Sequence, residues 1–243
     1  MKEVRYFYVP NADSITELPD DEALHALRVL RLKEGDKMML MDGVGNFYCA
    51  EVTLAAHRKC MYKITDTIPQ KPQWAGKLGI AIAPTKMMER MEWMVEKATE
   101  IGIDEISFLD CQFSERKVIK TDRLEKIVVS AVKQSRKAWK PQLNHIEAFK
   151  EFVNCPRQGK KFIAHCYNEI PRKFLFDELS NVDPADEVTV LIGPEGDFSP
   201  QEIEMAVAAG FIPVSLGDAR LRTETAALVA CDTCHIIDSI HNK

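Results

Sequence analysis

The residues best placed to do chemistry occur in two short loops, each of which follows an apolar, strand-like run. The first loop, Gly193-Pro-Glu-Gly196, follows the apolar run 188–192. Glycine lets a ligand approach the main chain closely, and open α/β sheets bind ligands at the carboxyl ends of their strands. The loop is therefore a candidate binding site, although its spacing alone also fits a tight turn that binds nothing.

The second loop, residues 217–222, follows the apolar run 211–216 and leads into the last predicted helix. It carries Arg220 and Arg222, and Glu224 lies at the start of that helix. Helix N-termini attract anions through their unpaired N–H groups and the helix dipole. Neither loop is a familiar phosphate motif, since the chain has no G-x-G-x-x-G and no Gly-Lys-Ser/Thr. Two such loops so close in sequence could line one pocket.

A helix is predicted directly after the first loop. Ser199 is a favoured N-cap residue, Pro200 suits the first helical position, and Glu202 completes a capping box. The first loop therefore joins a strand to a helix.

Two domains are predicted, with a boundary in the proline-spaced stretch 69–73. Residues 1–71 look like a small β-barrel with a hairpin turn at 42–46 and a short helix over 21–32, for which Asp20 is the expected cap. Strands are predicted in this part at 4–9, 37–41, 47–55 and 61–68.

Residues 72–243 alternate between strand-like and helical patterns, which indicates a parallel sheet covered on both faces. Helices are predicted over 86–101, with Met87 and Met91 on its apolar face, and over 121–139. Strands are predicted at 78–83, 105–109, 161–164, 188–192 and 211–216.

Composition narrows the class of protein. The chain has 243 residues, 46% of them hydrophobic, and no apolar run long enough to span a membrane. Its seven cysteines are an odd number and its start lacks the apolar core of a signal peptide, so we expect a cytoplasmic chain with reduced thiols. The pattern Cys231-Asp-Thr-Cys234-His235 has no second C-x-x-C, and we interpret it as packing rather than as a metal or haem site.

Charge is distributed unevenly along the chain. The net charge of −5 argues against a nucleic-acid partner, yet residues 113–140 carry 9 basic and 3 acidic side chains. This segment fits a solvated helix face, and it fits a footprint for phosphates equally well.

The two loops together resemble the 16S ribosomal RNA (uracil-N3) methyltransferase family, often called RsmE, in the SPOUT superfamily of S-adenosylmethionine (SAM) enzymes. The resemblance spans nearly the whole chain, and one departure is Asp197, where the family often has glycine. The motifs that carry it are Gly193-Pro-Glu-Gly196, Ser199-Pro-Gln-Glu202, Leu216-Gly217 and Leu221-Arg-Thr-Glu-Thr-Ala226, with Arg5-Tyr-Phe7, 25–31, 96–100, 114–116 and 134–136 matching elsewhere.

The resemblance implies a SPOUT domain over 72–243 with a C-terminal trefoil knot, and a PUA-like RNA-binding barrel over 1–71. It implies a homodimer with the SAM site near the interface. From the residues themselves we expect no metal and no membrane partner. The implied SAM-binding residues are Leu191, Ile192, Gly193, Pro194, Glu195, Gly196, Leu216, Gly217, Leu221, Arg222 and Thr223.

The implied reaction moves a methyl group from S-adenosyl-L-methionine to N3 of one uridine in the 16S rRNA of the small ribosomal subunit. N3 must lose its proton first, and the resulting charge spreads onto the carbonyl oxygens. We interpret Arg222 as the residue that stabilises this charge and Glu195 and Glu224 as candidate bases. The expected RNA contacts are Arg5, Arg28, Arg31, Arg116, Arg136 and Lys137.

Two other functions stay open. A related SPOUT enzyme could methylate ribose 2′-oxygens, and a catalytically silent chain could serve as an RNA-binding ribosome-assembly protein. Glycines at 193 and 196 argue against the silent chain, because a dead pocket has no need of them.

Overall fold

The computed structural model describes residues 5–241, which divide into two compact units. One unit comprises the chain up to Pro72 together with Val129–Lys140, and the other comprises Gln73–Val128 and the chain from Pro141 onward. Val4, placed in the first predicted strand, lies outside the described residues.

The first unit is built on a four-stranded sheet in the order β1-β2-β3-β4. Strand β1 pairs in parallel with β2, and the other neighbours are antiparallel. The predicted hairpin at 42–46 is confirmed: the buried Asp42 carboxylate accepts hydrogen bonds from the backbone N–H of Val44 and Asn46. The strands are β1 (Tyr6–Tyr8), β2 (Lys37–Met41), β3 (Asn46–Ala56) and β4 (Lys59–Pro69).

The short helix of this unit differs from its prediction. Helix α1 (Asp20–Leu24) gives way to a π-helical turn, η1 (His25–Val29). Asp20 is the first helical residue and Pro19 holds the cap position, so the prediction of an Asp20 cap is wrong.

The segment Val129–Lys140 belongs to the first unit through specific contacts. Lys133 Nζ lies 2.6 Å from a carboxylate oxygen of Glu22, and the Trp139 indole N–H donates to the Gln70 carbonyl. The backbone of Gly45 runs so close to the Trp139 ring that a Cβ there would lie 2.3 Å from a ring carbon. Helix α3 (Thr121–Ser135) ends four residues earlier than predicted, because Arg136 adopts a left-handed backbone with φ of 54°.

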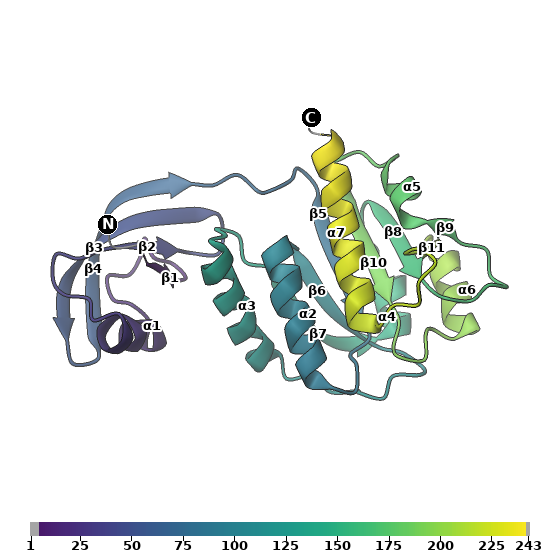
Figure 1. Ribbon diagram of the computed structural model, residues 1–243, viewed down its shortest axis with the longest axis horizontal. Helices are drawn as coiled ribbons and strands as arrows, with labels where there is room; N and C mark the ends of the chain where they lie inside the picture. The colour runs from purple at the N-terminus through teal and green to yellow at the C-terminus, as the bar shows by residue number, and fades with distance from the viewer. Residues whose placement is uncertain (1–4, 242–243) are drawn as a thin grey trace. The chain divides into compact units, whose positions relative to one another are not determined.

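The second unit contains a seven-stranded sheet in the order β7-β6-β5-β10-β8-β11-β9, in which every neighbouring pair is parallel (Figure 1). The predicted α/β fold is therefore confirmed. Strands β7 and β9 lie at the two edges and were not predicted. The strands are β5 (Lys77–Ile82), β6 (Glu105–Asp110), β7 (Gln142–Ala148), β8 (Lys160–Ala164), β9 (Lys173–Phe174), β10 (Glu187–Ile192) and β11 (Ile212–Ser215).

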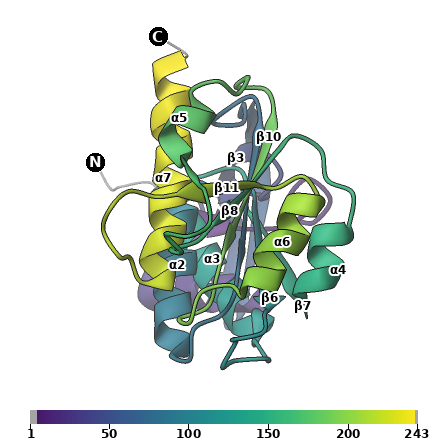
Figure 2. The same cartoon turned by 90° about the vertical axis from the view of Figure 1, so that its right-hand side faces the viewer.

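Helices cover both faces of this sheet. Figure 2 shows α2 and α7 on one face and α4 and α6 on the other. Phe152, Phe198 and Ile203 form an apolar core between the sheet and α4 and α6. The helices of this unit are α2 (Met88–Ile101), α4 (Phe149–Asn154), α5 (Leu175–Leu179), α6 (Pro200–Ala208) and α7 (Thr223–His241).

Helix α2 buries most of its predicted apolar face. Met91 and Met94 are fully buried, whereas Met87 is the N-cap residue and is 47% exposed. The prediction for Met87 is wrong because it precedes the first helical turn.

The capping box at the start of α6 is confirmed. Ser199 Oγ accepts from the Glu202 N–H, and the Glu202 carboxylate accepts from the Ser199 N–H at 2.8 Å. The other oxygen of Glu202 accepts from the Gln112 N–H at 2.8 Å. One buried carboxylate thus joins the helix after the first loop to the segment that follows β6.

Candidate functional site

A cavity of about 350 Å³ lies within the second unit, at the carboxyl edge of its sheet. Strands β10, β8 and β11 are consecutive neighbours, and because they are parallel their loops all leave at this edge. Cavities of about 300–1,000 Å³ are typical of small-molecule sites. The lining residues are Arg90, Ala164, His165, Cys166, Arg172, Ile192, Gly193, Pro194, Glu195, Asp197, Leu216, Gly217, Ala219, Arg220, Leu221, Arg222, Thr223, Glu224 and Ala226.

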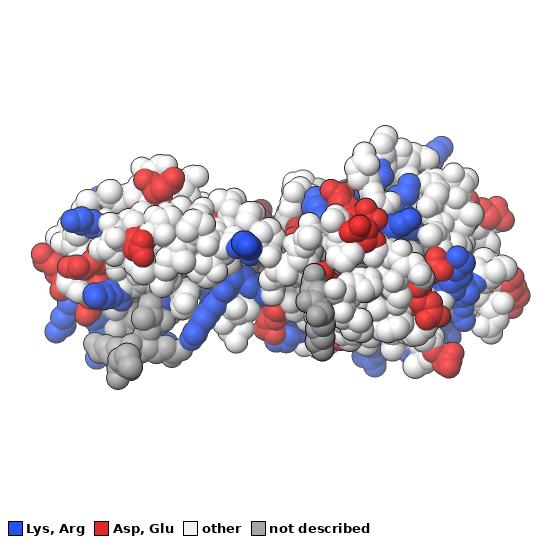
Figure 3. Space-filling model, turned by 90° about the horizontal axis from the view of Figure 1, so that it is seen from above, with Lys and Arg blue, Asp and Glu red and all other residues white. Residues whose placement is uncertain are grey.

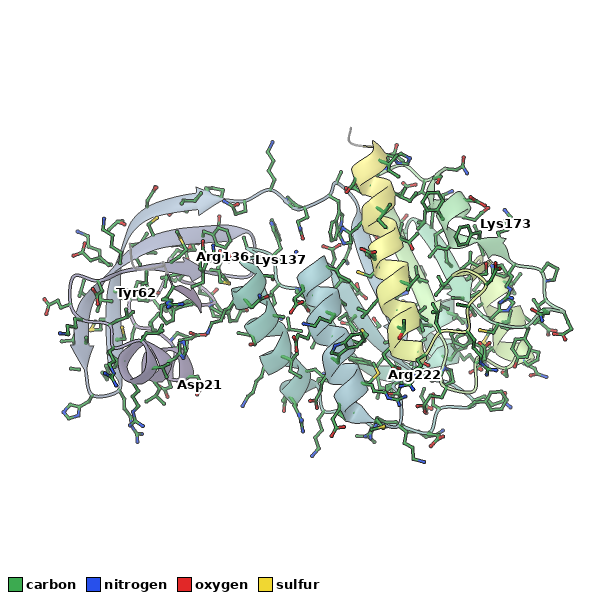
Figure 4. The ribbon with its side chains drawn as sticks, in the orientation of Figure 1. Asp21, Tyr62, Arg136, Lys137, Lys173 and Arg222 are labelled. Atoms are coloured by element: carbon green, nitrogen blue, oxygen red, sulfur yellow. The ribbon has the colours of Figure 1, made fainter. Side chains whose placement is uncertain are left out.

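Both predicted loops therefore contribute to one cavity. Two of the predicted cofactor residues are not among those that line it: Leu191 is fully buried in the core beside α6, and Gly196 lies against Phe113. A Cβ on Gly196 would lie 3.3 Å from the Phe113 Cβ, so this glycine serves close packing between loops. Figure 4 shows Arg222 beside the start of α7.

Several lining residues were missed from the sequence, and they come mainly from β8 and the segment after it. Ala164 is the last residue of β8, and His165 and Cys166 follow it; this stretch carries no glycine and no recognised motif. Their position follows from strand order, since β8 lies between β10 and β11. Arg90 and Arg172 were also missed. Asp197, Ala219, Arg220 and Ala226 lie in or beside the loops and motifs already singled out, but they were not named individually as cofactor residues.

Asp197 adopts a left-handed backbone conformation, which glycine adopts more readily than any other residue. Its φ is 69°, in the left-handed region that aspartate tolerates better than most side chains. One carboxylate oxygen accepts from the Cys166 N–H at 2.7 Å and the other from the Phe198 N–H at 2.8 Å. Aspartate in place of glycine therefore adds a hydrogen bond between the first loop and the residues after β8.

Arg90, on α2, faces both carboxylates that were predicted as bases. Its guanidinium lies 3.7 Å from an oxygen of Glu195 and 3.7 Å from an oxygen of Glu224. Glu195 also accepts from the Lys86 N–H at 3.4 Å. Glu224 is 5% exposed, and its Oε2 has no hydrogen-bond partner among residues 5–241. The cavity thus contains two acidic groups that share one cation.

His165 is the most buried ionisable side chain in the cavity, at 3% exposure. Neither ring nitrogen has a hydrogen-bond partner within the described chain. Burial lowers the pKa of His165 below its ordinary value of 6.5; nearby Asp197 opposes this shift and Arg172 adds to it. The ring is therefore neutral at pH 7.

The predicted RNA contacts fall in both units. Arg5, Arg28 and Arg31 are exposed in the first unit. Arg136, 5.3 Å above the Tyr6 ring, and Lys137 belong to the same unit (Figure 4).

Arg116 belongs to the second unit, where its guanidinium donates to the Thr85 and Lys86 carbonyls. On the face seen in Figure 3, basic and acidic side chains are interspersed.

The Cys231–Cys234–His235 pattern is explained by packing. Cys231 is fully buried and its thiol lies 3.2 Å from the Gly102 carbonyl, which His235 Nε2 also contacts at 2.7 Å. Within residues 5–241, no group of three or more His, Cys, Asp or Glu residues is arranged to hold a metal ion. Over the same residues, no helix combines the length and apolar character needed to cross a membrane.

Comparison with known proteins gives consistent matches over both units. A family model for an RNA methyltransferase domain matches residues 72–235, and one for an RNA methyltransferase PUA domain matches residues 18–60. Ribosomal RNA small subunit methyltransferase E from Synechocystis sp. is 30% identical over 85% of this chain and 68% of its own length.

Two solved structures extend the comparison. A "probable rRNA-methyltransferase" from Porphyromonas gingivalis is 43% identical, with a TM-score of 0.92 over 98% of this chain and 100% of its own. Ribosomal RNA small subunit methyltransferase E from Neisseria gonorrhoeae, bound to S-adenosyl methionine, is 26% identical, with a TM-score of 0.83 over 96% and 98% of the two chains.

The burial of His165 leads to a prediction about stability and pH. Below pH 6.5 the unfolded chain binds a proton at His165 that the folded chain does not. The free energy of unfolding of the natural chain should therefore fall relative to that of a His165→Leu variant as the pH decreases below 6.5, and the difference should level off below the folded pKa. Urea denaturation of both chains without ligand, at a series of pH values, measures this. Parallel pH profiles would contradict a neutral, buried ring.

Proposed function

Because the chain belongs to the ribosomal RNA small subunit methyltransferase E family of RNA methyltransferases, we propose that it transfers a methyl group from SAM to N3 of a uridine in 16S rRNA. The observation that carries this proposal is the single cavity formed by the two motif loops at the carboxyl edge of the parallel sheet. We also propose a cytoplasmic location, which an rRNA substrate in the small ribosomal subunit supports. The trefoil knot implied by the SPOUT resemblance stays a prediction.

The residues present fit SAM. The cavity has the volume of a small-molecule site, and it contains buried polar atoms that the described chain leaves without partners, on His165 and Glu224. We propose that the loops 192–195 and 216–223 hold the cofactor, with Leu191 and Gly196 supporting them from behind. When bound, SAM supplies a methyl group already activated by a sulfonium centre.

The protein must then bring a deprotonated uracil N3 into line with the methyl group. We propose that Arg222 stabilises the negative charge that spreads onto the uracil oxygens. Of the two candidate bases, Glu224 is favoured as the proton acceptor because its Oε2 has no hydrogen-bond partner in the described chain, whereas Glu195 accepts from Lys86. Arg90 holds both carboxylates in place.

RNA binding is assigned to the basic residues predicted from sequence. Arg5, Arg28, Arg31, Arg136 and Lys137 share the unit that contains the match to the RNA methyltransferase PUA domain. Arg116 is anchored by backbone carbonyls beside the start of α2. The target uridine has to be unpaired or flipped, because pairing hides N3.

A homodimer is proposed from the exposed apolar side chains of two helices. Ile236 and Ile240 on α7 are 47% and 53% exposed, and Trp93 on the adjoining α2 is 46% exposed. We infer that these exposed apolar side chains on two neighbouring helices contribute to an interface. Helix α7 also starts at the cavity wall with Thr223.

Light scattering after size-exclusion chromatography should give twice the chain mass of 27.6 kDa, and Ile236→Glu should shift it to the mass of one chain. A natural chain that elutes as a monomer would contradict the proposed dimer.

The proposed reaction is tested by incubating the chain with labelled SAM and unmodified small ribosomal subunits, alongside protein-free rRNA, followed by nucleoside mass spectrometry. 3-Methyluridine is the expected product. A 2′-O-methylated nucleoside, which also blocks alkaline cleavage of the RNA, would support the ribose methyltransferase instead. SAM binding without transfer would indicate a different RNA target, and no SAM binding would favour an RNA-binding protein without catalysis.

Replacing Arg222 with alanine should lower turnover at saturating SAM by about 100-fold or more, as expected for the loss of a group that stabilises transition-state charge. The thermal unfolding midpoint should be unchanged. Lys173→Ala is the matched control, since Lys173 pairs with Glu178 at 2.9 Å and does not line the cavity. Near-normal turnover in the Arg222 variant would show that Arg222 does not stabilise charge in the transition state.

Replacing Arg28 with alanine should weaken RNA binding and reduce the slope of log K against log salt concentration by about 0.7, the contribution of one single-strand phosphate contact. Filter binding across a salt series measures the slope. Lys59→Ala removes a charge that already pairs with Glu17 and serves as the control. An unchanged slope in the Arg28 variant would exclude Arg28 from the RNA footprint.

A further inference from the structure

The side chain of His165 is buried in the cavity wall, yet its ring nitrogens have no hydrogen-bond partner within the described chain. It lies at the end of β8, with the loops of β10 and β11 on either side, and lines the cavity at 3% exposure. Both Nδ1 and Nε2 lack a hydrogen-bond partner among residues 5–241. Buried polar groups are nearly always paired, and leaving one unpaired is costly. The ring is therefore placed for a partner that the chain does not supply.

The main chain around His165 is, by contrast, well anchored. Its N–H donates to the Val214 carbonyl at 3.3 Å, and its carbonyl accepts from the Arg172 guanidinium. The next N–H, of Cys166, donates to the Asp197 carboxylate at 2.7 Å. These contacts fix the residues after β8 to strand β11, to the loop after β10 and to Arg172, so the imidazole occupies one place in the cavity wall.

The chemistry of the ring selects one part of the cofactor. Four arginines also line the cavity: Arg90, Arg172, Arg220 and Arg222. Guanidinium groups are the natural partners of a carboxylate, and the amino-acid half of SAM carries one. A neutral imidazole offers one donor and one acceptor, which matches the adenosine half, whose ribose hydroxyls both donate and accept.

We propose that His165 is a cofactor-binding residue that forms hydrogen bonds with the adenosine half of SAM through its ring nitrogens. The proposal rests on the proposed function, because it takes SAM as the occupant of the cavity. Burial and Arg172 keep the pKa of His165 low despite Asp197, and a neutral ring does not repel the sulfonium cation. A structural histidine would instead pair with the chain itself.

The test is isothermal titration of the natural chain and His165→Leu with SAM and with 5′-methylthioadenosine, which keeps adenosine and lacks the amino-acid half. Loss of a buried hydrogen bond should weaken both ligands by about tenfold. Tyr167→Phe is the control: its ring centroid lies 6.1 Å from that of His165, and Tyr167 does not line the cavity. Unfolding in urea without ligand should show His165→Leu to be as stable as the natural chain or more so.

The outcomes separate this inference from the proposed function. Failure of the natural chain to bind SAM overturns both. Normal SAM binding by His165→Leu overturns the inference alone, as expected for a ring that holds only a water molecule. If His165→Leu binds SAM more weakly but binds 5′-methylthioadenosine normally, the ring contacts the amino-acid half of SAM. That result overturns the adenosine assignment. Lower stability of His165→Leu without ligand shows that the ring is structural, and also overturns it.

Discussion

The site depends on one geometric constraint: parallel strands that are neighbours in a sheet all end at the same edge. Strands β10, β8 and β11 are consecutive in the sheet, although β8 precedes β10 by more than twenty residues. Their loops therefore meet, and charged and polar side chains from separate segments of the chain combine in one cavity. Helices cover both faces of the sheet, and the apolar core beneath α4 and α6 packs against β8 and β10 through Ile163 and Leu191.

Hydrogen bonds and ion pairs between loops and helices turn this shared edge into a defined cavity. Asp197 accepts an N–H from the end of β8, Glu202 accepts one from the segment after β6, and Arg90 faces two acidic side chains from α2. Each of these is a charged group held by partners from a different loop or helix. Such charge-assisted contacts are stronger and more directional than neutral ones. The cavity wall is therefore set by the chain before any ligand arrives, which is what alignment of two reactants requires.

Much of this arrangement can be predicted from local sequence, and the remainder depends on contacts that local sequence does not encode. The β10 strand, the capping box of Ser199 and Glu202, and the hairpin at 42–46 each follow from residues close together in the chain. The sequence of strand β7 is too polar to be predicted as a buried strand, because β7 lies at a sheet edge. His165 has no motif around it and becomes a site residue only through strand order. The membership of 129–140 in the first unit depends on Lys133 and Trp139, whose partners lie far away in sequence.

The most direct test of this account is a crystal structure of the chain grown with SAM. The account predicts electron density for the cofactor in the cavity between the loops after β10 and β11, with its adenosine half within hydrogen-bond distance of the His165 ring and its carboxylate facing the arginines. Density for SAM at another surface, or an empty cavity at saturating SAM, would contradict the central claim that this edge of the sheet is the cofactor site.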